Sequence, residues 1–232
     1  MDDALSKLHA GRLKSGEYPV VIRAGAMADL LTTFAGIFSA ENAQQGLSLL
    51  AGREGERVAS PCVTRADDPL MPWGLGSSPF DREGAATYKK NVVEDGVLRT
   101  LLHNRKTAKK AGVQTTGNAA GGGRVAPSNL YIVPGDASLD ELLAEMGDGL
   151  YLTEVSGLHA GANPVSGDFS LLSRGFEVKG GRLTRPVEQF TVAGNFYRLL
   201  ESIEQVGDDL LFEGSPIGCP SVRVTGLSVA GE

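Results

Sequence analysis

Histidine is scarce in this chain of 232 residues, and the scarcity excludes the commonest zinc-peptidase motif. Only three histidines are present, His9, His103 and His159, and none of them has a second histidine four residues later. An HExxH zinc helix needs that spacing because both imidazoles must project from one face, with the glutamate beside them. The motif is absent. A site assembled from dispersed His, Asp and Cys side chains stays open at this point.

Cysteine and long apolar runs are also nearly missing. The two cysteines, Cys62 and Cys219, are far apart in sequence, which favours free thiols in a reducing compartment. No stretch approaches the roughly 18 apolar residues of a membrane span, and the acidic start "MDDALSKLHAGRLKSG" has no apolar signal core. We therefore expect a soluble cytoplasmic protein without a membrane partner.

Positive charge is not in excess. Lys and Arg total 22 against 28 Asp and Glu, a formal net charge of −6. That balance opposes direct binding to a phosphate backbone, so no nucleic-acid partner is expected. One short basic stretch, "NRKTAKKA" at 104–111, is interpreted as a solvated helix face.

Motifs for nucleophilic or phosphate chemistry are weak or absent. There is no G-x-S-x-G elbow, and the glycine-rich "GNAAGGGR" at 117–124 lacks both nucleotide-loop spacings. That stretch instead allows the close approach of another backbone or of a bound peptide. Ser170, His159 and Asp168 could form a catalytic set only through a geometry that sequence does not supply. An enzyme of unrelated chemistry using Asp168, His159 or Cys219 therefore has no positive signal.

Glycine, by contrast, is abundant, with 31 residues, and turn signals separate short apolar runs. Asp95-Gly96 and Gly180-Gly181 each lie between β-prone runs and predict hairpins. Apolar spacing predicts one helix over 27–38 and another over 195–207, and Ser138 with Glu141 forms a capping box before a helix at 139–146. We expect an α+β fold with a mostly antiparallel, hairpin-rich, curved or barrel-like sheet and flanking helices.

Several phrases, all in order, resemble the TldD/PmbA family. They are "GSSPFDREGAAT", "VVEDGVLRTLLHNRKTAKKAGVQTTGNA", "LYIVPGDASLDELLAEMGDGLYLTEVSG", "ANPVSGDFSLLSRGFEVKGGRLTRPVEQFTVAGNFYRLLESIEQVGDDL" and "GCPSVRVTGLSVAGE". The resemblance covers residues 17–232 and implies the C-terminal domain of the family. Residues 1–16 are then expected to be a linker or helix remnant of a missing N-terminal domain.

The resemblance implies a cytoplasmic two-subunit peptidase that matures a modified peptide and degrades unfolded chains. The TldD type carries the HExxH zinc site, whereas the PmbA type lacks it and helps to form the cleft. Residues 28–44, "ADLLTTFAGIFSAENAQ", correspond to the HExxH helix but hold no histidine, and Cys219 lies near a further ligand position. The expectation is a PmbA-type chain with no catalytic residue, no metal ligand and no cofactor, zinc being held by a TldD-type partner. Instead of pairing with a TldD-type subunit, the chain could form a homodimer. The alternative function is a protein-binding regulatory module of the gyrase-modulator type.

The same resemblance marks candidate substrate-binding residues. "NPVSGDFS" matches a segment that lines the family's cleft, so Asn163, Ser166, Asp168 and Ser170 are expected to bind an extended peptide substrate. Asn118, in the glycine-rich stretch, completes the set. The alternative interpretation of 163–170 is a plain structural turn whose polar groups satisfy one another.

Overall fold

The computed structural model describes residues 11–231, except for the side chain of Glu188. The ten N-terminal residues of the expected linker or helix remnant lie outside this range. Within its described part, residues 11–15 form no helix; Gly11 makes an isolated bridge to Val187, and Gly16 begins the first strand.

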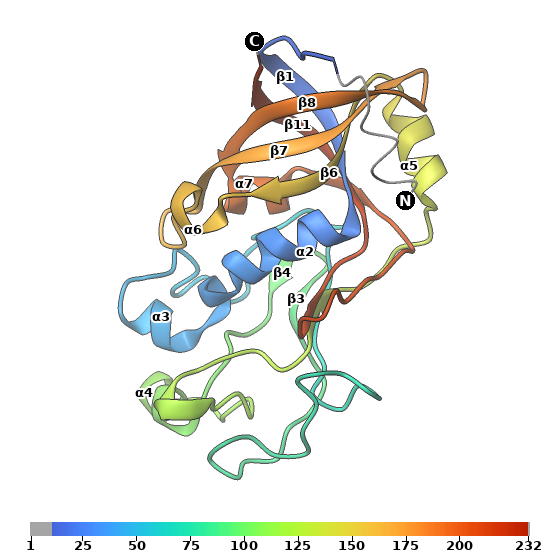
Figure 1. The fold of residues 1–232 in the computed structure, drawn as a ribbon. Coiled ribbons are helices and arrows are strands. Elements are labelled where there is room, and N and C mark those ends of the chain that lie inside the picture. The colour runs from blue at the N-terminus through green and yellow to red at the C-terminus, as the bar shows by residue number, and fades with distance from the viewer. Residues whose placement is uncertain (1–10, 232) are drawn as a thin grey trace.

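Five strands close into a barrel, which is the upper half of Figure 1. They pair in the order β1, β6, β7, β8, β11, and β1 pairs again with β11 to complete the ring, while β9 pairs with Val222–Val224 of β11. All neighbours are antiparallel except β1 and β6. The strands are β1 (Gly16–Ile22), β6 (Gly149–Ser156), β7 (Asp168–Lys179), β8 (Arg182–Asn195), β9 (Ile203–Val206) and β11 (Val222–Ala230). This confirms the predicted α+β fold with a barrel-like sheet.

A second, smaller sheet lies below the barrel. Its order is β10, β5, β2, β3, β4, with only β10 and β5 parallel. The strands are β2 (Arg65–Asp67), β3 (Lys90–Glu94), β4 (Val97–Leu98), β5 (Leu130–Ile132) and β10 (Ile217–Gly218).

Helix α2 is sandwiched between the two sheets (Figure 1). It contacts β6 of the barrel on one side and β10 of the second sheet on the other, which leaves little of it exposed. The remaining helical elements are shorter and lie around the sheets. The helices are α2 (Ala24–Thr33), η1 (Ala35–Phe38), α3 (Ala40–Gln44), α4 (Arg105–Ala111), η2 (Gly121–Gly123), α5 (Leu139–Met146), α6 (Leu158–Gly161) and α7 (Phe196–Glu201).

The apolar run of β1 is explained by burial on both faces of its strand. Val20 and Ile22 join the main core, whereas Val21 points outward to a small cluster with Leu142 and Leu143 of α5. A strand covered on both sides needs consecutive apolar residues instead of an alternating pattern. Helix α5 therefore serves as the outer cover of the barrel at this strand.

Both predicted hairpins are present, and one predicted helix is wrong in its second half. β3 and β4 turn at Asp95-Gly96, and β7 and β8 turn at Gly180-Gly181. The predicted helix at 195–207 instead ends at Glu201, and Ile203–Val206 form β9 against β11. The predicted helix at 27–38 is shorter too, because α2 stops at Thr33 and a 3-10 turn continues to Phe38.

None of the helices within residues 11–231 combines the length and the apolar character that a membrane span requires.

Candidate functional site

Four of the five expected substrate-binding residues lie close together: Asn163 and Ser166 in the loop between α6 and β7, and Asp168 and Ser170 at the start of β7. Alternation along β7 places Phe169 inside the barrel and leaves Asp168 and Ser170 exposed. Phe169 packs against Phe34 with ring centroids 6.4 Å apart, and Phe34 stacks on Phe196 at 4.5 Å. The aromatic contacts therefore fix the register that turns Asp168 and Ser170 toward solvent.

The turn before Asp168 is closed by its own hydrogen bonds. The side-chain Oδ1 of Asn163 accepts from the N–H groups of Val165 and Ser166, at 3.0 and 3.3 Å. The Gly167 N–H donates to the Asn163 carbonyl at 2.9 Å, and the Asn163 N–H to the Asp168 carbonyl at 2.8 Å. Asn163 thus acts mainly as a turn residue, as the alternative interpretation of this segment held.

Asn195 fastens this loop to helix α7. Its Nδ2 donates to Asp168 Oδ1 at 2.8 Å and to the Ser166 carbonyl at 2.9 Å, while its Oδ1 accepts from the N–H groups of Tyr197 and Arg198. Sequence reasoning missed Asn195. The available signal was an asparagine directly before the helical run "FYRLLE", the usual helix N-cap position.

Asp168 is the common wall of two pockets. One, of about 580 Å³, is bounded by residues 160–164 and 168–170. The other, of about 390 Å³, lies between β8, β11 and α7 and includes Glu17 and Arg198. Hydrogen bonds from Asn195 and Ser166, together with the nearby Arg198 cation, lower the pKa of the Asp168 carboxyl below its ordinary value. A carboxylate that is charged at neutral pH therefore lines both pockets, and Arg198 lines one of them with it.

This arrangement can bind polar groups of a ligand but does not form a serine triad. Between His159 and either Ser170 or Asp168 no hydrogen bond is formed in the described structure, and Asp168 is bonded to Asn195 instead. Exposed Ser170, the Asp168 carboxylate and the Arg198 guanidinium are the groups that could meet an incoming peptide.

Asn118 lies elsewhere, in a buried network below the barrel. Its Oδ1 accepts from Lys90 Nζ at 3.3 Å and from Thr116 Oγ1 at 2.7 Å; its Nδ2 donates to Asp67 Oδ2 at 2.8 Å and to the Ala126 carbonyl at 3.1 Å. All the polar capacity of its amide is therefore used within the protein. The structure does not bring Asn118 together with the other four residues: the pocket that it lines shares no residue with the two pockets at Asp168.

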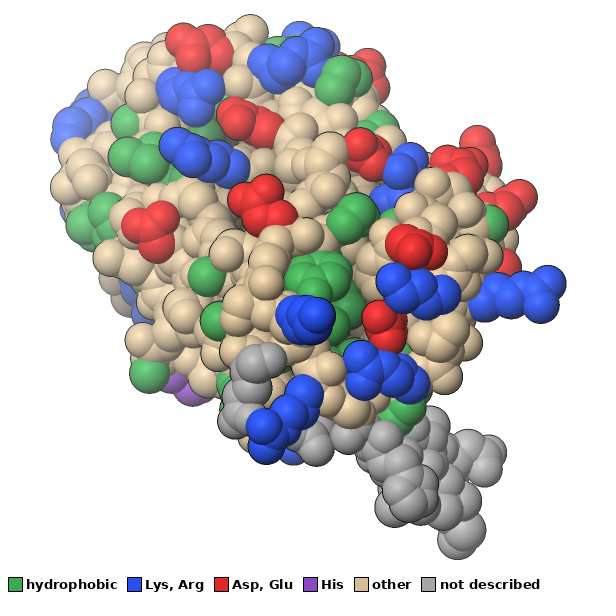
Figure 2. Space-filling view, turned by 90° about the horizontal axis from the view of Figure 1, so that it is seen from above, with side chains coloured by type: hydrophobic (Ala, Val, Ile, Leu, Met, Phe, Trp, Pro, Cys, Tyr) green, Lys and Arg blue, Asp and Glu red, His purple; other side chains and the backbone are tan. Residues whose placement is uncertain are grey.

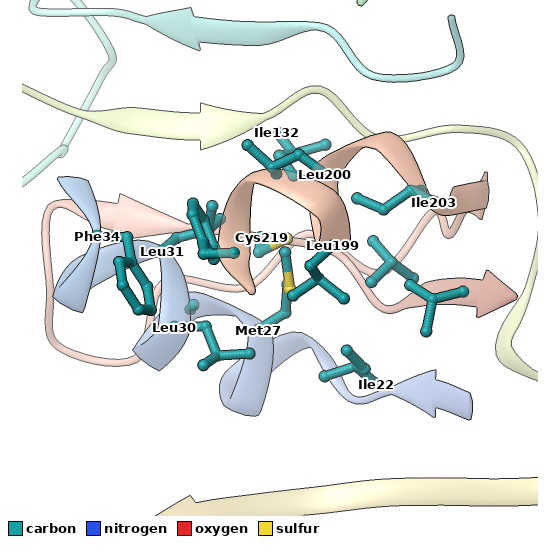
Figure 3. Close-up of a cluster of buried hydrophobic side chains, with 14 of the residues drawn as sticks. Ile22, Met27, Leu30, Leu31, Phe34, Ile132, Leu199, Leu200, Ile203 and Cys219 are labelled. Carbon is teal, nitrogen blue, oxygen red and sulfur yellow. The ribbon is translucent and has the colours of Figure 1, made fainter. Parts of the chain in front are cut away.

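Residues 28–44, which the resemblance suggests as the counterpart of a zinc helix, contribute to the apolar core. Met27, Leu31 and Phe34 are fully buried on α2 and its C-cap, and Figure 3 shows them in one cluster with Cys219 and with Leu199 and Leu200 of α7. The hydroxyls of Thr32 and Thr33 donate to carbonyls of their own helix. The donors that a zinc ion requires are not on this surface of the helix.

Cys219 is buried among these apolar groups and interacts electrostatically with the Arg65 guanidinium. Burial is the main cause that raises the pKa of its thiol well above the ordinary value. A protonated thiol beside a fixed cation is a poor ligand for a second cation. In residues 11–231 no group of three or more His, Cys, Asp or Glu side chains is arranged to hold a metal. The residues present therefore do not fit a zinc ion.

A five-stranded barrel, a second sheet and an intervening helix, with a polar loop fastened at the mouth, define a domain of the PmbA/TldD class of metallopeptidase-related proteins. The chain belongs to this family: residues 15–231 match the model described as the PmbA/TldA metallopeptidase C-terminal domain.

Named relatives agree with this assignment. Metalloprotease PmbA of Escherichia coli O157:H7 is 30% identical over 228 residues, 98% of this chain and 49% of the relative. A metalloprotease of Archaeoglobus fulgidus is 38% identical over 205 residues, 86% of this chain and 47% of the relative. The chain thus spans about half the length of the curated relatives it matches.

Solved structures show the same fold. The crystal structure of a Thermotoga maritima protein, named as a candidate modulator of a DNA gyrase, superposes with a TM-score of 0.95 at 47% identity and covers 99% of this chain and 53% of its own. TldE from Thermococcus kodakarensis superposes with a TM-score of 0.89 at 26% identity, covering 99% of this chain and 54% of its own.

Proposed function

We propose that this chain is the PmbA-type subunit region of a two-subunit peptidase, acting in peptide maturation and in proteolysis of unfolded chains in the cytoplasm. It contributes a wall of the substrate cleft and no metal ligand, and a TldD-type partner supplies the zinc. The observation that carries the proposal is that α2 and its C-cap bury Met27, Leu31 and Phe34 in the apolar core and carry no histidine.

The loop at Asp168 supports a role in binding an extended peptide. Asn195 and the turn at Asn163 hold the loop in place, so a ligand would meet a preorganised surface. Ser170 and Asp168 face solvent on one strand, where they can reach polar groups of a chain laid along the barrel mouth.

Reconstitution with a TldD-type subunit tests the proposal. Relatives of both types occur, since the chain is also 28% identical to a protein named metalloprotease TldD homolog. The purified chain alone should contain no stoichiometric zinc by elemental analysis and should leave an unfolded substrate intact. The mixture with the TldD-type subunit should cut it. Zinc bound stoichiometrically by this chain alone, with peptide cleavage, would overturn the proposal.

A pair of variants separates a cleft role from a structural one. Ser170→Tyr places a large side chain at the pocket of residues 160–170 and should slow cleavage by the mixture. Leu183→Tyr, on an exposed part of β8 away from both pockets, should leave the rate unchanged. If both variants fold and cleave at equal rates, the loop at Asp168 is not part of the substrate cleft.

The regulatory alternative rests on the gyrase-modulator description of the Thermotoga maritima relative. It is favoured if affinity capture recovers topoisomerase subunits and no family partner.

A further inference from the structure

A third pocket, distant in sequence from the Asp168 loop, opens between two loops of the second sheet. It has a volume of about 550 Å³ and is bounded by residues 75–78, 80–82, 117–121 and 126–128, together with Thr87. Of the expected substrate-binding residues only Asn118 lines it, and the proposed cleft at Asp168 does not include it.

Apolar side chains stand exposed at this pocket. Leu75 and Phe80 line it, although they are 70% and 60% exposed, and the single tryptophan, Trp73, is fully exposed in the same loop. Trp73 is also held at φ 61°, a left-handed conformation that residues other than glycine seldom adopt. Several bulky apolar residues exposed in one loop are typical of a contact surface.

The walls of the pocket are tied together, so the apolar residues are presented on a fixed frame. The Asp81 carboxylate accepts from the N–H groups of Glu83, Ala85 and Ala119, at 2.9, 2.9 and 3.0 Å. Asn129 Oδ1 accepts from the Gly76 N–H at 2.9 Å, and a Cβ at Gly76 would come within 2.2 Å of the Ser128 carbonyl oxygen. A pocket fixed in this way loses little entropy when a ligand enters.

A cluster of cations stands beside the pocket. Helix α4 carries Arg105, Lys106, Lys109 and Lys110, all exposed, and no acidic residue. Its start is bonded to residues that flank the pocket lining, because Asn104 Nδ2 donates to the Gly123 carbonyl at 2.8 Å and the Arg105 N–H donates to Glu83 Oε2 at 2.8 Å.

These cations form no ion pair with the described residues, whereas several cations of the barrel do. Within the described part of the chain, no ion pair is formed by any basic side chain of α4 or by Arg82, which lines the pocket. At the barrel end, Figure 2 shows basic and acidic side chains interspersed, and pairs such as Arg185 with Glu177, at 2.7 Å, neutralise one another. Positive potential is therefore concentrated at the pocket although the chain is acidic as a whole.

We infer that this pocket and the basic face of α4 bind an acidic peptide segment that carries a bulky apolar side chain. The apolar side chain would enter between Leu75 and Phe80, and neighbouring carboxylates would lie against the cations of α4 and Arg82. The apolar side chain of the peptide matches the pocket, and its burial supplies affinity. The carboxylates of the peptide match the cations, and this opposite charge orients the peptide and speeds its association.

A peptide fits this surface better than a nucleic acid does. The net charge of −6 disfavours a continuous phosphate chain, and the carboxylates of Asp81 and Glu83 are part of the site. An acidic peptide can place neutral residues over those carboxylates, whereas every unit of a nucleic acid is charged.

Trp73 offers a direct assay. The probe is a short synthetic peptide of Glu and Gly with one central Phe, titrated into the whole chain while Trp73 emission is followed, with calorimetry as a second readout. We expect a Kd of about 100 μM or tighter and a shift of the emission to shorter wavelength. Raising the salt concentration from about 50 to about 500 mM should weaken binding.

Matched variants locate the site. The triple change Lys106→Gln, Lys109→Gln and Lys110→Gln should weaken binding about tenfold. Lys14→Gln, Lys179→Gln and Arg182→Gln, made together on the barrel, remove the same charge and should change nothing. Phe80→Ser should likewise weaken binding, whereas Leu183→Ser, also an exposed apolar position, should not.

Three results would overturn the inference: no binding in either readout, equal binding of a peptide with Lys in place of Glu, or tighter binding of a single-stranded oligonucleotide of the same charge. The assay uses this chain without a peptidase partner, so a negative outcome leaves the reconstitution experiment unaffected, and the reverse also holds.

Discussion

The guanidinium of Arg65 lies over the ring of Phe38, 4.5 Å from its centre, and none of its three nitrogen atoms has a hydrogen-bond partner among the described residues. Arg65 is only 1% exposed and is the largest fully buried side chain of the described structure. An arginine in such a place is held mainly by packing and by the face of the aromatic ring. Its polar atoms lose their contact with water without full compensation.

Replacing Arg65 with methionine should therefore stabilise the protein. An unsatisfied buried polar group costs about 1–3 kcal/mol, and an apolar residue of similar length removes that cost. We expect Arg65→Met to raise the free energy of unfolding by about 1 kcal/mol, measured by urea denaturation, and Arg65→Ala to lower it because a cavity remains. If Arg65→Met is less stable than wild type, the prediction is wrong, and a buried group must form hydrogen bonds with the guanidinium.

The advantage of Arg65→Met should depend on pH. Burial lowers the pKa of Arg65 from 12.5 to about 9 in the folded chain. The cost of the buried charge is fully present below the folded value and falls as pH rises from about 9 toward 12.5, because only the unfolded chain then keeps the proton. The stability difference between variant and wild type should accordingly shrink above pH 9.

Lys89 and Lys90 are adjacent in sequence but opposite in importance. Lys90 Nζ lies 3.0 Å from Asp67 Oδ2, with side chains 5% and 0% exposed, whereas Lys89 is 57% exposed and lies 3.5 Å from Asp68. Lys90→Met leaves the Asp67 carboxylate buried without its counter-charge and should cost about 3–5 kcal/mol. Lys89→Met is the control and should cost no more than about 1 kcal/mol. Chemical denaturation of the two variants measures the contrast; equal losses would contradict it.

Gly96 should tolerate no side chain. It adopts φ 78°, and a Cβ there would lie 2.3 Å from the Ala59 carbonyl oxygen. Gly84 has a similar φ of 71°, but a Cβ there would meet no atom within 4 Å. An alanine at Gly84 therefore measures the cost of the backbone strain without the clash. We expect Gly84→Ala to lose about 1–2 kcal/mol and Gly96→Ala about 3 kcal/mol or more. Thermal unfolding of both variants distinguishes the two effects, and equal melting temperatures would refute the clash.

The bond between Asn195 and Asp168 should stabilise the loop only while Asp168 is charged. The pKa of Asp168 is lowered in the folded chain, so its contribution is complete above the unfolded value of about 3.9 and is lost as pH falls through the lower folded value. Asp168→Asn should melt at a lower temperature than wild type at pH 7, and the difference should disappear in acid, once the pH is below the lowered folded pKa of Asp168.

Asp208→Asn is the control for this pH dependence, because the Asp208 carboxylate makes no hydrogen bond in the described structure. Its melting temperature should follow that of wild type across the range. A difference for Asp168→Asn that persists in acid would mean that the bond does not depend on charge.

Local signals in the sequence predicted much of the fold. Asp95-Gly96, Gly180-Gly181 and the capping box at Ser138 are short-range features whose chemistry is complete within a few residues, and all appear as expected. The run 195–207 was misjudged because its helical spacing continues past Glu201. Pairing of Ile203–Val206 with β11 overrides that spacing, and no pattern within the run identifies its partner strand.

The candidate site was predictable only in part. The exposure of Asp168 and Ser170 follows from strand alternation around Phe169. The surroundings of Asn118 could not be predicted, because a glycine-rich sequence reveals flexibility of the backbone but not which buried charges surround it. The partners Lys90 and Asp67 come from two strands far away in sequence, and only the second sheet brings them to Asn118.

The pairing of β1 with β11 has a consequence for synthesis. Gly16 lies opposite Val229, and the Ser15 hydroxyl and Gly231 backbone bond one another, so residues made more than two hundred positions apart form one seam. Contacts this distant in sequence are slow to form because a long loop must be closed first. On the ribosome, the first strand must wait, with one edge unprotected, until residues 222–230 have emerged. Chaperones that shield such edges would matter most during this interval.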